Sequence, residues 1–194
     1  MQGVGPYVVF VDANVWFSRT LRDWLGMLYT TPENPSFVVH WTEDVLAELI
    51  HHLRKTHSDW SGSRITTLRD RLSETFEAGR VAEFTIDATY RGNDPGDAHV
   101  HAAAVACGAD VLVTCNVGDF DWDENTSPYE VMHPDDFFVL VDDSSPELVA
   151  AVAAKMSEYW VRRDGESDLP QRLRKAGCPQ FAARVLAHLQ QMAF

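Results

Sequence analysis

Two short runs with continuous apolar stretches limit most strongly what this chain of 194 residues can fold into. They cover residues 7–11 and 110–114, and polar residues follow each of them. Continuous apolar strands are typical of a sheet that is buried on both faces, as parallel sheets covered by helices are. Strand-like and helix-like segments alternate between the two runs. We therefore predict an α/β fold with a central, mostly parallel sheet flanked by helices.

Further segments complete this pattern. Strands are predicted over residues 36–41 and 129–132, while residues 81–86 fit either a short strand or an extended connection. Thr42 and Pro134 each mark the start of a helix. The other predicted helices cover residues 15–29, 64–78, 98–107, 146–163 and 169–192, the last with a break near Gly177.

The net charge of −13 is concentrated in one region. The chain has no Lys or Arg between Arg91 and Lys155, and thirteen acids lie there, while acids and bases balance in the rest of the chain. This charge argues against non-specific binding to nucleic acids, whereas a local excess of acids suits a cation site. Some of these acids, Asp142 and Asp143 among them, are expected on a solvated face.

Asp94 and Asp97 lie where a helix is predicted to begin. Pro95 disfavours helix at Asp94, and small residues follow Asp97 as far as Gly108. Two interpretations remain open for this stretch. The acids are either a plain helix cap with an acidic first turn, or part of a functional site.

Other acids are placed where they can join this pair. Asp12 ends the first strand, Asp119 follows the strand at 110–114, and Glu48 lies beside the apolar stripe of its helix. Asp12 fits a helix cap equally well, and Glu48 also fits a rim position. Right-handed connections bring the carboxyl ends of parallel strands to one edge of the sheet. Two like charges about 5 Å apart repel by roughly 3 kcal/mol at an effective dielectric near 20, so clustered acids need a counterion or protons.

Four pieces of sequence resemble the PIN-domain nucleases, and specifically the VapC-like ribonuclease toxins of bacterial toxin–antitoxin pairs. They are residues 9–14, 45–49, 94–100 with Ala103 and Ala104, and 109–120; residues 134–137 also resemble one subgroup. The resemblance implies a PIN-like nuclease domain over residues 1–141. Residues 142–194 would then be a C-terminal helical extension packed on the same domain.

The resemblance also implies roles for individual residues. The metal-site and catalytic acids would be Asp12, Glu48, Asp97 and Asp119. Asp94 and Asp121 would support them, and Asn14, Thr114 and Asn116 would orient carboxylates or substrate. Oxygen ligands suit Mg²⁺, with Mn²⁺ as an alternative, and such a site assists hydrolysis of RNA phosphodiesters. The implied partners are a small cognate antitoxin that blocks the site and a second copy of the chain in a homodimer.

The remaining expectations concern binding and setting. We expect RNA to contact Arg19, Arg22, Arg54 and Lys55 around the acidic site. His99 and His101 fit either phosphate contacts or a packed helix, and packing is favoured. Three widely spaced cysteines indicate a reducing, cytoplasmic setting, and the sequence predicts neither a signal peptide nor a membrane span.

Two functions of other classes remain as alternatives. One is a phosphate-signalling or phosphotransfer protein, either receiver-like or like the haloacid-dehalogenase phosphatases, which also place an Asp after the first strand. Those families imply a Lys at the end of a later strand, and the interval after Arg91 has none. The other is an inactive PIN-like interaction module.

Overall fold

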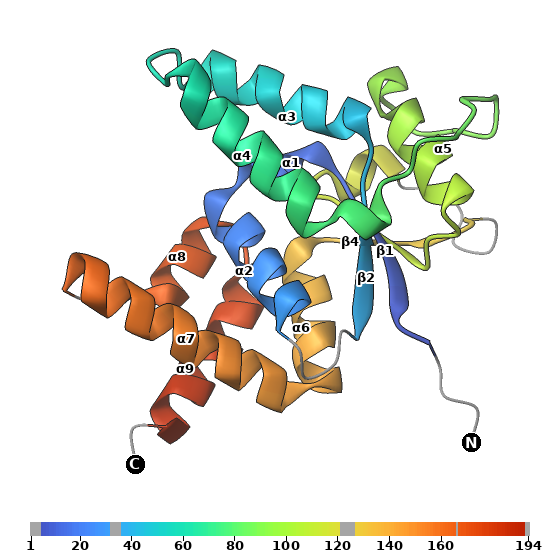
Figure 1. Cartoon of the computed structure of the whole chain (residues 1–194). Coiled ribbons are helices and arrows are strands. Elements are labelled where there is room, and N and C mark those ends of the chain that lie inside the picture. The colour runs from blue at the N-terminus through green and yellow to red at the C-terminus, as the bar shows by residue number, and fades with distance from the viewer. Residues whose placement is uncertain (1–4, 32–35, 121–126, 166, 193–194) are drawn as a thin grey trace. The chain divides into compact units, whose positions relative to one another are not determined.

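A computed structural model of the chain describes residues 5–31, 36–120, 127–165 and 167–192 (Figure 1). The chain forms two compact units. The first comprises Met1–Phe17 and Phe37–His133, and the second comprises Ser18–Ser36 and Pro134–Phe194. The predicted division into domains at residue 141 stays a prediction.

A parallel sheet of four strands lies in the first unit, as predicted. In sheet order the strands are β2 (Phe37–His40), β1 (Tyr7–Val11), β3 (Val111–Val113) and β4 (Glu130–Met132). All three pairings are parallel. The apolar run of β1 is explained by its central place in the sheet, since Val9, Phe10 and Val11 are fully buried.

The order of the strands brings two strand ends together. The chain leaves β1 for β2 on one side and later returns to β3 on the other side of β1. Val11 pairs with Val113, so Asp12 and Thr114 follow the two strands as neighbours. The Asp12 amide donates to the Val113 carbonyl at 3.1 Å. Such a reversal of strand order is where open α/β sheets place their ligand sites.

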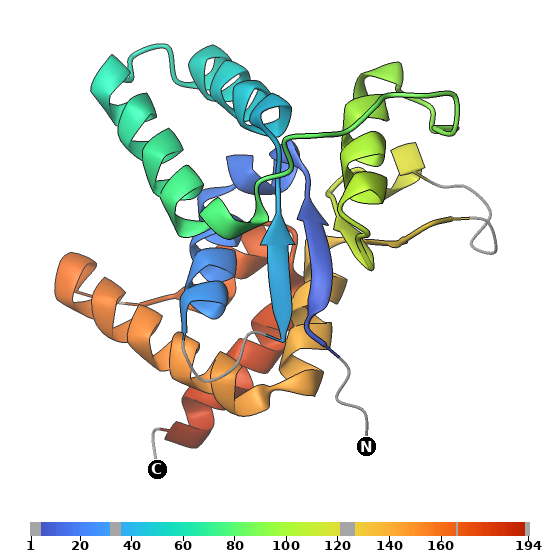
Figure 2. The same ribbon diagram turned by 45° about the vertical axis from the view of Figure 1, so that its right-hand side comes forward.

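Helices border this carboxyl end of the sheet. In both views α3 and α4 lie on one side of it and α5 lies on the other (Figures 1 and 2). The helical elements of the first unit are α1 (Ala13–Phe17), α3 (Glu43–Thr56), α4 (Gly62–Thr75), η1 (Glu77–Gly79), η2 (Pro95–Asp97), α5 (Ala98–Ala106) and η3 (Val117–Phe120). Residues 81–86 form an extended connection.

Two predicted helix boundaries were wrong. The helix expected over residues 15–29 is interrupted at Ser18, whose hydroxyl accepts a hydrogen bond from the Leu21 amide and starts α2 (Arg19–Thr30). The helix expected to end at Gly79 ends at Thr75, and η1 follows it. Gly79 lies against the backbone of β2, where an added Cβ would come within 1.7 Å of the Val39 carbonyl oxygen. This close approach requires Gly at that turn.

The second unit is helical, as expected for the C-terminal extension. It contains α2, α6 (Pro134–Ser144), α7 (Pro146–Asp164), α8 (Leu169–Lys175) and α9 (Pro179–Met192). Its core includes Phe181, whose ring lies 4.9 Å from that of Trp24 and 5.0 Å from that of Phe138.

Two acids of this unit are buried. Asp135 accepts hydrogen bonds from the Gln180 and Phe181 amides and so caps α9. Asp142 lies 2.6 Å from His188 Nε2 and 3.4 Å from Arg184 Nη1. The expectation of a solvated face was therefore wrong for Asp142, because its partners come from a helix that begins much later in the sequence. Asp143 is exposed, as expected.

Candidate active site

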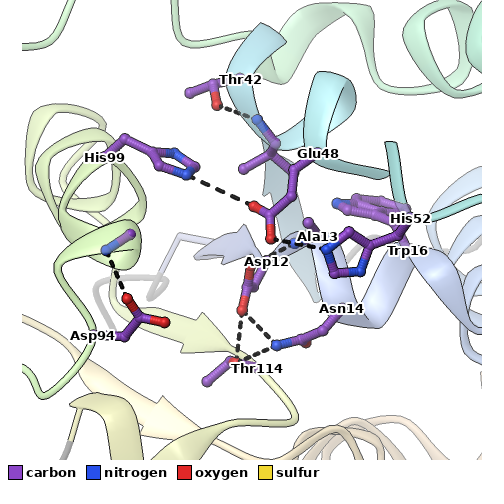
Figure 3. A network of polar contacts seen from close by, with 12 residues as sticks. Asp12, Ala13, Asn14, Trp16, Thr42, Glu48, His52, Asp94, His99 and Thr114 are labelled. Atoms are coloured by element: carbon purple, nitrogen blue, oxygen red, sulfur yellow. Dashed lines mark hydrogen bonds and ion pairs between the residues drawn. The ribbon is translucent and has the colours of Figure 1, made fainter. Parts of the chain in front are cut away.

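Asp12 lies at the carboxyl end of the central strand and is 96% buried. One of its oxygens accepts a hydrogen bond from the Thr114 hydroxyl at 2.8 Å and another from the Asn14 side-chain Nδ2 at 2.6 Å (Figure 3). The other oxygen faces the Ala13 amide at the start of α1. Burial raises the pKa of Asp12, and the hydrogen bond from Thr114 opposes this rise.

Thr114 and Asn14 hold each other as well as Asp12. The Thr114 hydroxyl accepts from Asn14 Nδ2 and from the Asn116 backbone amide, both at 3.0 Å. The Asn14 side-chain oxygen Oδ1 accepts from the Cys115 backbone amide at 2.9 Å. Asn116 thus takes part through its backbone. This network fixes the orientation of the Asp12 carboxylate relative to β3.

Asp94 and Asp97 have different local roles. The Asp94 side chain accepts from the Gly96 amide at 2.8 Å and caps η2. Asp97 precedes α5, but its side chain makes no capping hydrogen bond there. Of the two interpretations left open for this stretch, the helix cap applies to Asp94. The Asp97 carboxylate does not cap the helix.

The carboxylates act on one another electrostatically. The pKa of Asp97 is raised from 3.8 to about 7, first by burial and then by the charges of Asp12, Asp94, Asp119 and Glu48. Like charges raise a pKa in this way only at short range. Acids from four separate segments of the chain therefore converge at the carboxyl end of the sheet.

Glu48 comes to this place from α3. Thr42 caps that helix through the Val45 amide, and the buried Val45, Leu46 and Leu49 hold it against the core. The Glu48 side chain is 38% exposed; its Oε2 lies 3.7 Å from His99 Nε2 and its Oε1 lies 3.8 Å from His52 Nε2. Figure 3 shows Glu48 between these two rings and close to Asp12. The neighbouring His99 imidazole is the main cause that lowers the pKa of Glu48.

His99 and His101 differ in their surroundings. His101 is buried, with Nδ1 2.7 Å from the Tyr129 hydroxyl and Nε2 3.0 Å from the Thr89 hydroxyl, and burial lowers its pKa. His99 faces Glu48, which raises the pKa of the imidazole. Packing therefore describes His101, whereas His99 belongs to the acidic site. Residues two apart on a helix point in different directions, a signal that could have separated the two.

Asp119 lies in η3, which a neighbouring segment holds in place. The Asp119 carbonyl oxygen accepts from the Asn93 amide and the Tyr90 hydroxyl, each at 3.3 Å. Asn93 Nδ2 donates to the Gly118 carbonyl at 3.1 Å. Burial and then the charges of the nearby acids raise the pKa of Tyr90 to about 12. Sequence reasoning gave no role to Tyr90 or Asn93, because both act through backbone carbonyls that are distant in sequence.

Comparison with known families shows which family the sequence matches. The family profile described as "PIN domain" matches residues 8–118, which include Asp12, Glu48, Asp94 and Asp97. The chain belongs to the PIN-domain family. Searches among curated proteins and among solved structures found no match. PIN domains are generally nucleases, and they typically use divalent metal ions such as Mg²⁺.

The donor chemistry of this PIN domain fits a hard divalent cation, since carboxylate oxygens dominate the site. Among the described residues, however, no group of three or more His, Cys, Asp or Glu side chains is arranged to hold a metal ion. The reason is local: Glu48 is turned towards two imidazoles, and Asp94 towards a backbone amide. Asp121 lies outside the described residues.

The predicted RNA-binding residues fall in both units. Arg54 and Lys55 are exposed in the last turn of α3, which also carries Glu48. Arg19 and Arg22 lie in α2 of the second unit, where Arg19 pairs with Asp23 at 3.4 Å and burial lowers the pKa of Arg22. The described helices include none that is long and apolar enough to cross a membrane.

Proposed function

We propose that this PIN domain is a Mg²⁺-dependent endoribonuclease that hydrolyses RNA phosphodiester bonds, with Mn²⁺ as an alternative ion. The observation that carries the proposal is that the charges of four other acids add to burial in raising the pKa of Asp97 to about 7. Repulsion of this kind is relieved when a cation binds between the carboxylates. Oxygen donors without a thiolate favour Mg²⁺ or Mn²⁺ over Zn²⁺.

Asp12, Glu48, Asp97 and Asp119 would hold the ion, with Asp94 and Asp121 in support. When bound, the ion polarises a phosphoryl oxygen and lowers the pKa of a bound water. The chain's own contribution is orientation. Thr114 and Asn14 keep one oxygen of Asp12 fixed by hydrogen bonds, and the Asn116 amide holds the Thr114 hydroxyl in turn. Supporting hydrogen bonds of this kind typically matter ten- to a hundredfold for metal affinity or activity.

Glu48 and His99 form a pair that can hold a proton beside the site. The imidazole pKa is raised and the carboxyl pKa is lowered, so a proton shared by the pair lies mainly on His99. A protonated His99 would also place a positive charge next to the acids, where a substrate phosphate must approach. This supports a nuclease whose acidic site still admits a polyanion.

The finer proposal is that the protein is the toxin of a toxin–antitoxin pair and acts in the cytoplasm. What supports it is the resemblance of residues 9–14, 94–100 and 109–120 to VapC-like toxins. RNA would contact Arg54, Lys55, Arg19 and Arg22, a small antitoxin would block the site, and the chain would form a homodimer. The PIN-domain match does not favour the phosphotransfer alternatives.

Cleavage of a mixed pool of single-stranded RNA in Mg²⁺ tests the proposal. The parent should cleave the pool, EDTA should stop cleavage, and Asp97→Asn should reduce it by at least about a hundredfold while the protein stays folded. Glu74→Gln, which removes the charge of an exposed acid on α4 outside the acidic site, serves as the control and should cleave like the parent. If no RNA pool is cleaved and Mg²⁺ does not stabilise the parent, the inactive interaction module is the better account.

A further inference from the structure

The loop between α3 and α4 gathers basic side chains in an otherwise acidic protein. Residues 51–64, here called the α3–α4 corner, contain Arg54, Lys55, Arg64 and three histidines but a single acid, Asp59. The three Lys and Arg side chains are exposed, and none of them forms an ion pair within the described residues.

Two arginines near the corner are paired with acids: Arg69 lies 2.5 Å from Asp70, and Arg80 lies 2.9 Å from Glu43. Arg71 of α4 forms no ion pair within the described residues. The corner is therefore distinguished by the gathering of three unpaired cations in one place, although the chain has acids in excess. Unpaired cations on an acidic protein favour an anionic partner at that place.

The corner also has an ordered stack of three planar groups. The His57 ring lies parallel to Trp60, with centroids 4.2 Å apart and an interplanar angle of 5°. The Arg64 guanidinium carbon lies 3.7 Å from the Trp60 ring centroid. At these distances the His57 ring and the Arg64 guanidinium cannot share one face of the indole, so Trp60 lies between them. Arg54 Nη1 donates to the Trp60 carbonyl at 2.8 Å and fixes the loop that presents the indole.

Such a stack matches the chemistry of single-stranded nucleic acid. Unpaired bases stack on aromatic rings and on arginine planes, and cations beside them contact the phosphates. Because Arg64 is exposed, its outer face can receive a base as a fourth layer. Contacts within the chain hold His57, Trp60 and Arg64 together, which lowers the entropy cost of binding.

The corner is connected to the acidic site by one helix. Glu48, His52 and Lys55 are spaced four and three residues apart, so they share one face of α3. Seven residues of helix place Lys55 about 10 Å along the axis from Glu48. Figure 2 shows α3 running from the carboxyl end of the sheet to the turn into α4. An RNA strand with a phosphate at the carboxylates can therefore follow this face to the corner.

We infer that the α3–α4 corner binds a single-stranded segment of RNA that flanks the bond to be cleaved. A base stacks on Arg64, which Trp60 and His57 support from behind, and Lys55 contacts the backbone phosphates. The inference rests on the proposed function, because it names the form in which that site takes its substrate. It predicts that the enzyme needs unpaired nucleotides on one side of the scissile bond.

Binding of a fluorescein-labelled oligouridylate of about 12 nucleotides, measured by fluorescence anisotropy in EDTA, tests the inference. Arg64→Ala should weaken binding about tenfold, whereas Arg69→Ala, which removes the same charge from the paired arginine on α4, should change it by less than about twofold. Arg64→Lys keeps the charge but loses the planar group. It should weaken binding without changing the salt slope, while Arg64→Ala should reduce that slope by about 0.7.

An RNA duplex of the same length is the second probe. Its bases are already stacked on one another, so Arg64→Lys should leave duplex binding unchanged. The inference is wrong if Arg64→Ala binds oligouridylate like Arg69→Ala, if the parent does not bind oligouridylate, or if Arg64→Lys weakens both probes equally. If Arg64→Ala lost binding to an acidic protein but kept its binding to oligouridylate, the inference would also be wrong. The anisotropy measures binding and not cleavage, so the result is independent of whether Asp97→Asn abolishes cleavage.

Discussion

Asp94 and Asp97 lie three residues apart and yet meet different partners. The Asp94 carboxylate accepts a hydrogen bond from the Gly96 amide at the start of η2, whereas the Asp97 side chain makes no capping hydrogen bond and is subject to the charges of four other acids. At the scale of single residues, the candidate site thus depends on which acids already have hydrogen-bond or ion-pair partners within the chain. Asp12 accepts hydrogen bonds from Thr114 and Asn14, and Glu48 forms an ion pair with His99. The pKa of Asp97 is raised to about 7, by burial and then by the charges of the other acids.

Asp97→Asn should stabilise the protein in EDTA at alkaline pH. The folded-state pKa of about 7 lies above the ordinary 3.8, so the stability contributed by this group is present below pH 3.8 and lost as the pH rises through 7. The variant should match the parent near pH 4 and exceed it increasingly up to about pH 7. The gain should be on the order of 1 kcal/mol, after allowance for solvent screening of a half-buried carboxyl.

Thermal unfolding of both proteins across this pH range measures the effect. Glu74→Gln is the control for the loss of one acidic side chain. A constant difference between parent and Asp97→Asn at all pH values would contradict the repulsion that we assign to Asp97.

Thr114→Val should impair the site without changing its shape. The hydroxyl is fully buried and donates to Asp12, so its loss leaves a buried carboxylate with one fewer donor and costs about 1–3 kcal/mol of stability. Cleavage should fall about ten- to a hundredfold. Thr114→Ser keeps the hydroxyl and should keep most of the activity. Equal activity of the Val and Ser variants would show that the hydroxyl does not orient Asp12.

At the scale of elements, η3 is positioned by the segment that contains Tyr90, Gly92 and Asn93. Hydrogen bonds from Tyr90 and Asn93 reach the carbonyls of Gly118 and Asp119. Gly92 lies so close to η3 that an added Cβ would come within 2.1 Å of the Asp119 carbonyl oxygen. The position of the Asp119 carboxylate is therefore tied to a glycine far from it in sequence.

Gly92→Ala should displace η3 and lower cleavage by about a hundredfold, because a shift of about 1 Å at a catalytic group has an effect of this size. Gly118→Ala is the matched control: it adds the same methyl group within η3 itself, where nothing lies within 4 Å of the new Cβ. Measured cleavage rates should separate the two variants. Equal loss in both would mean that the contact between Gly92 and Asp119 does not position the site.

The elements also show what could be predicted from the sequence. The strands and the convergence of the acids at their ends were predictable, because apolar runs followed by Asp or Thr carry a local signal. The break at Ser18 was not, because the apolar periodicity continues across it from Trp16 to Leu21. The buried state of Asp142 and the role of Tyr90 depend on partners distant in sequence, which no local pattern reveals.

At the scale of the whole molecule, the net charge of −13 opposes both RNA binding and the close approach of the acids. A bound divalent cation reduces the repulsion between the acids, so it should stabilise the folded chain as a whole. Exposed cations such as Lys55 and Arg64 offset the repulsion between the acidic protein and RNA only locally, and salt screens their effect.

Mg²⁺ should therefore raise the unfolding temperature of the parent. At about ten times its Kd the ion contributes about 1.4 kcal/mol, which corresponds to roughly 3–6 °C for a chain of this size. Excess EDTA should reverse the shift, and Asp97→Asn should show little of it. NaCl at matched ionic strength is the control. A shift of the same size in NaCl would indicate general screening of the acids and no specific site.

The most direct test of the converging carboxylates is the pKa of Asp97, measured by NMR of the ¹³C-labelled side-chain carboxyl. In EDTA the account predicts a value of about 7, raised by burial and by Asp12, Asp94, Asp119 and Glu48. Addition of Mg²⁺ should lower it to well below its ordinary value, because a bound cation favours the ionised form. A pKa near 3.8 in EDTA that does not change with Mg²⁺ would contradict the account.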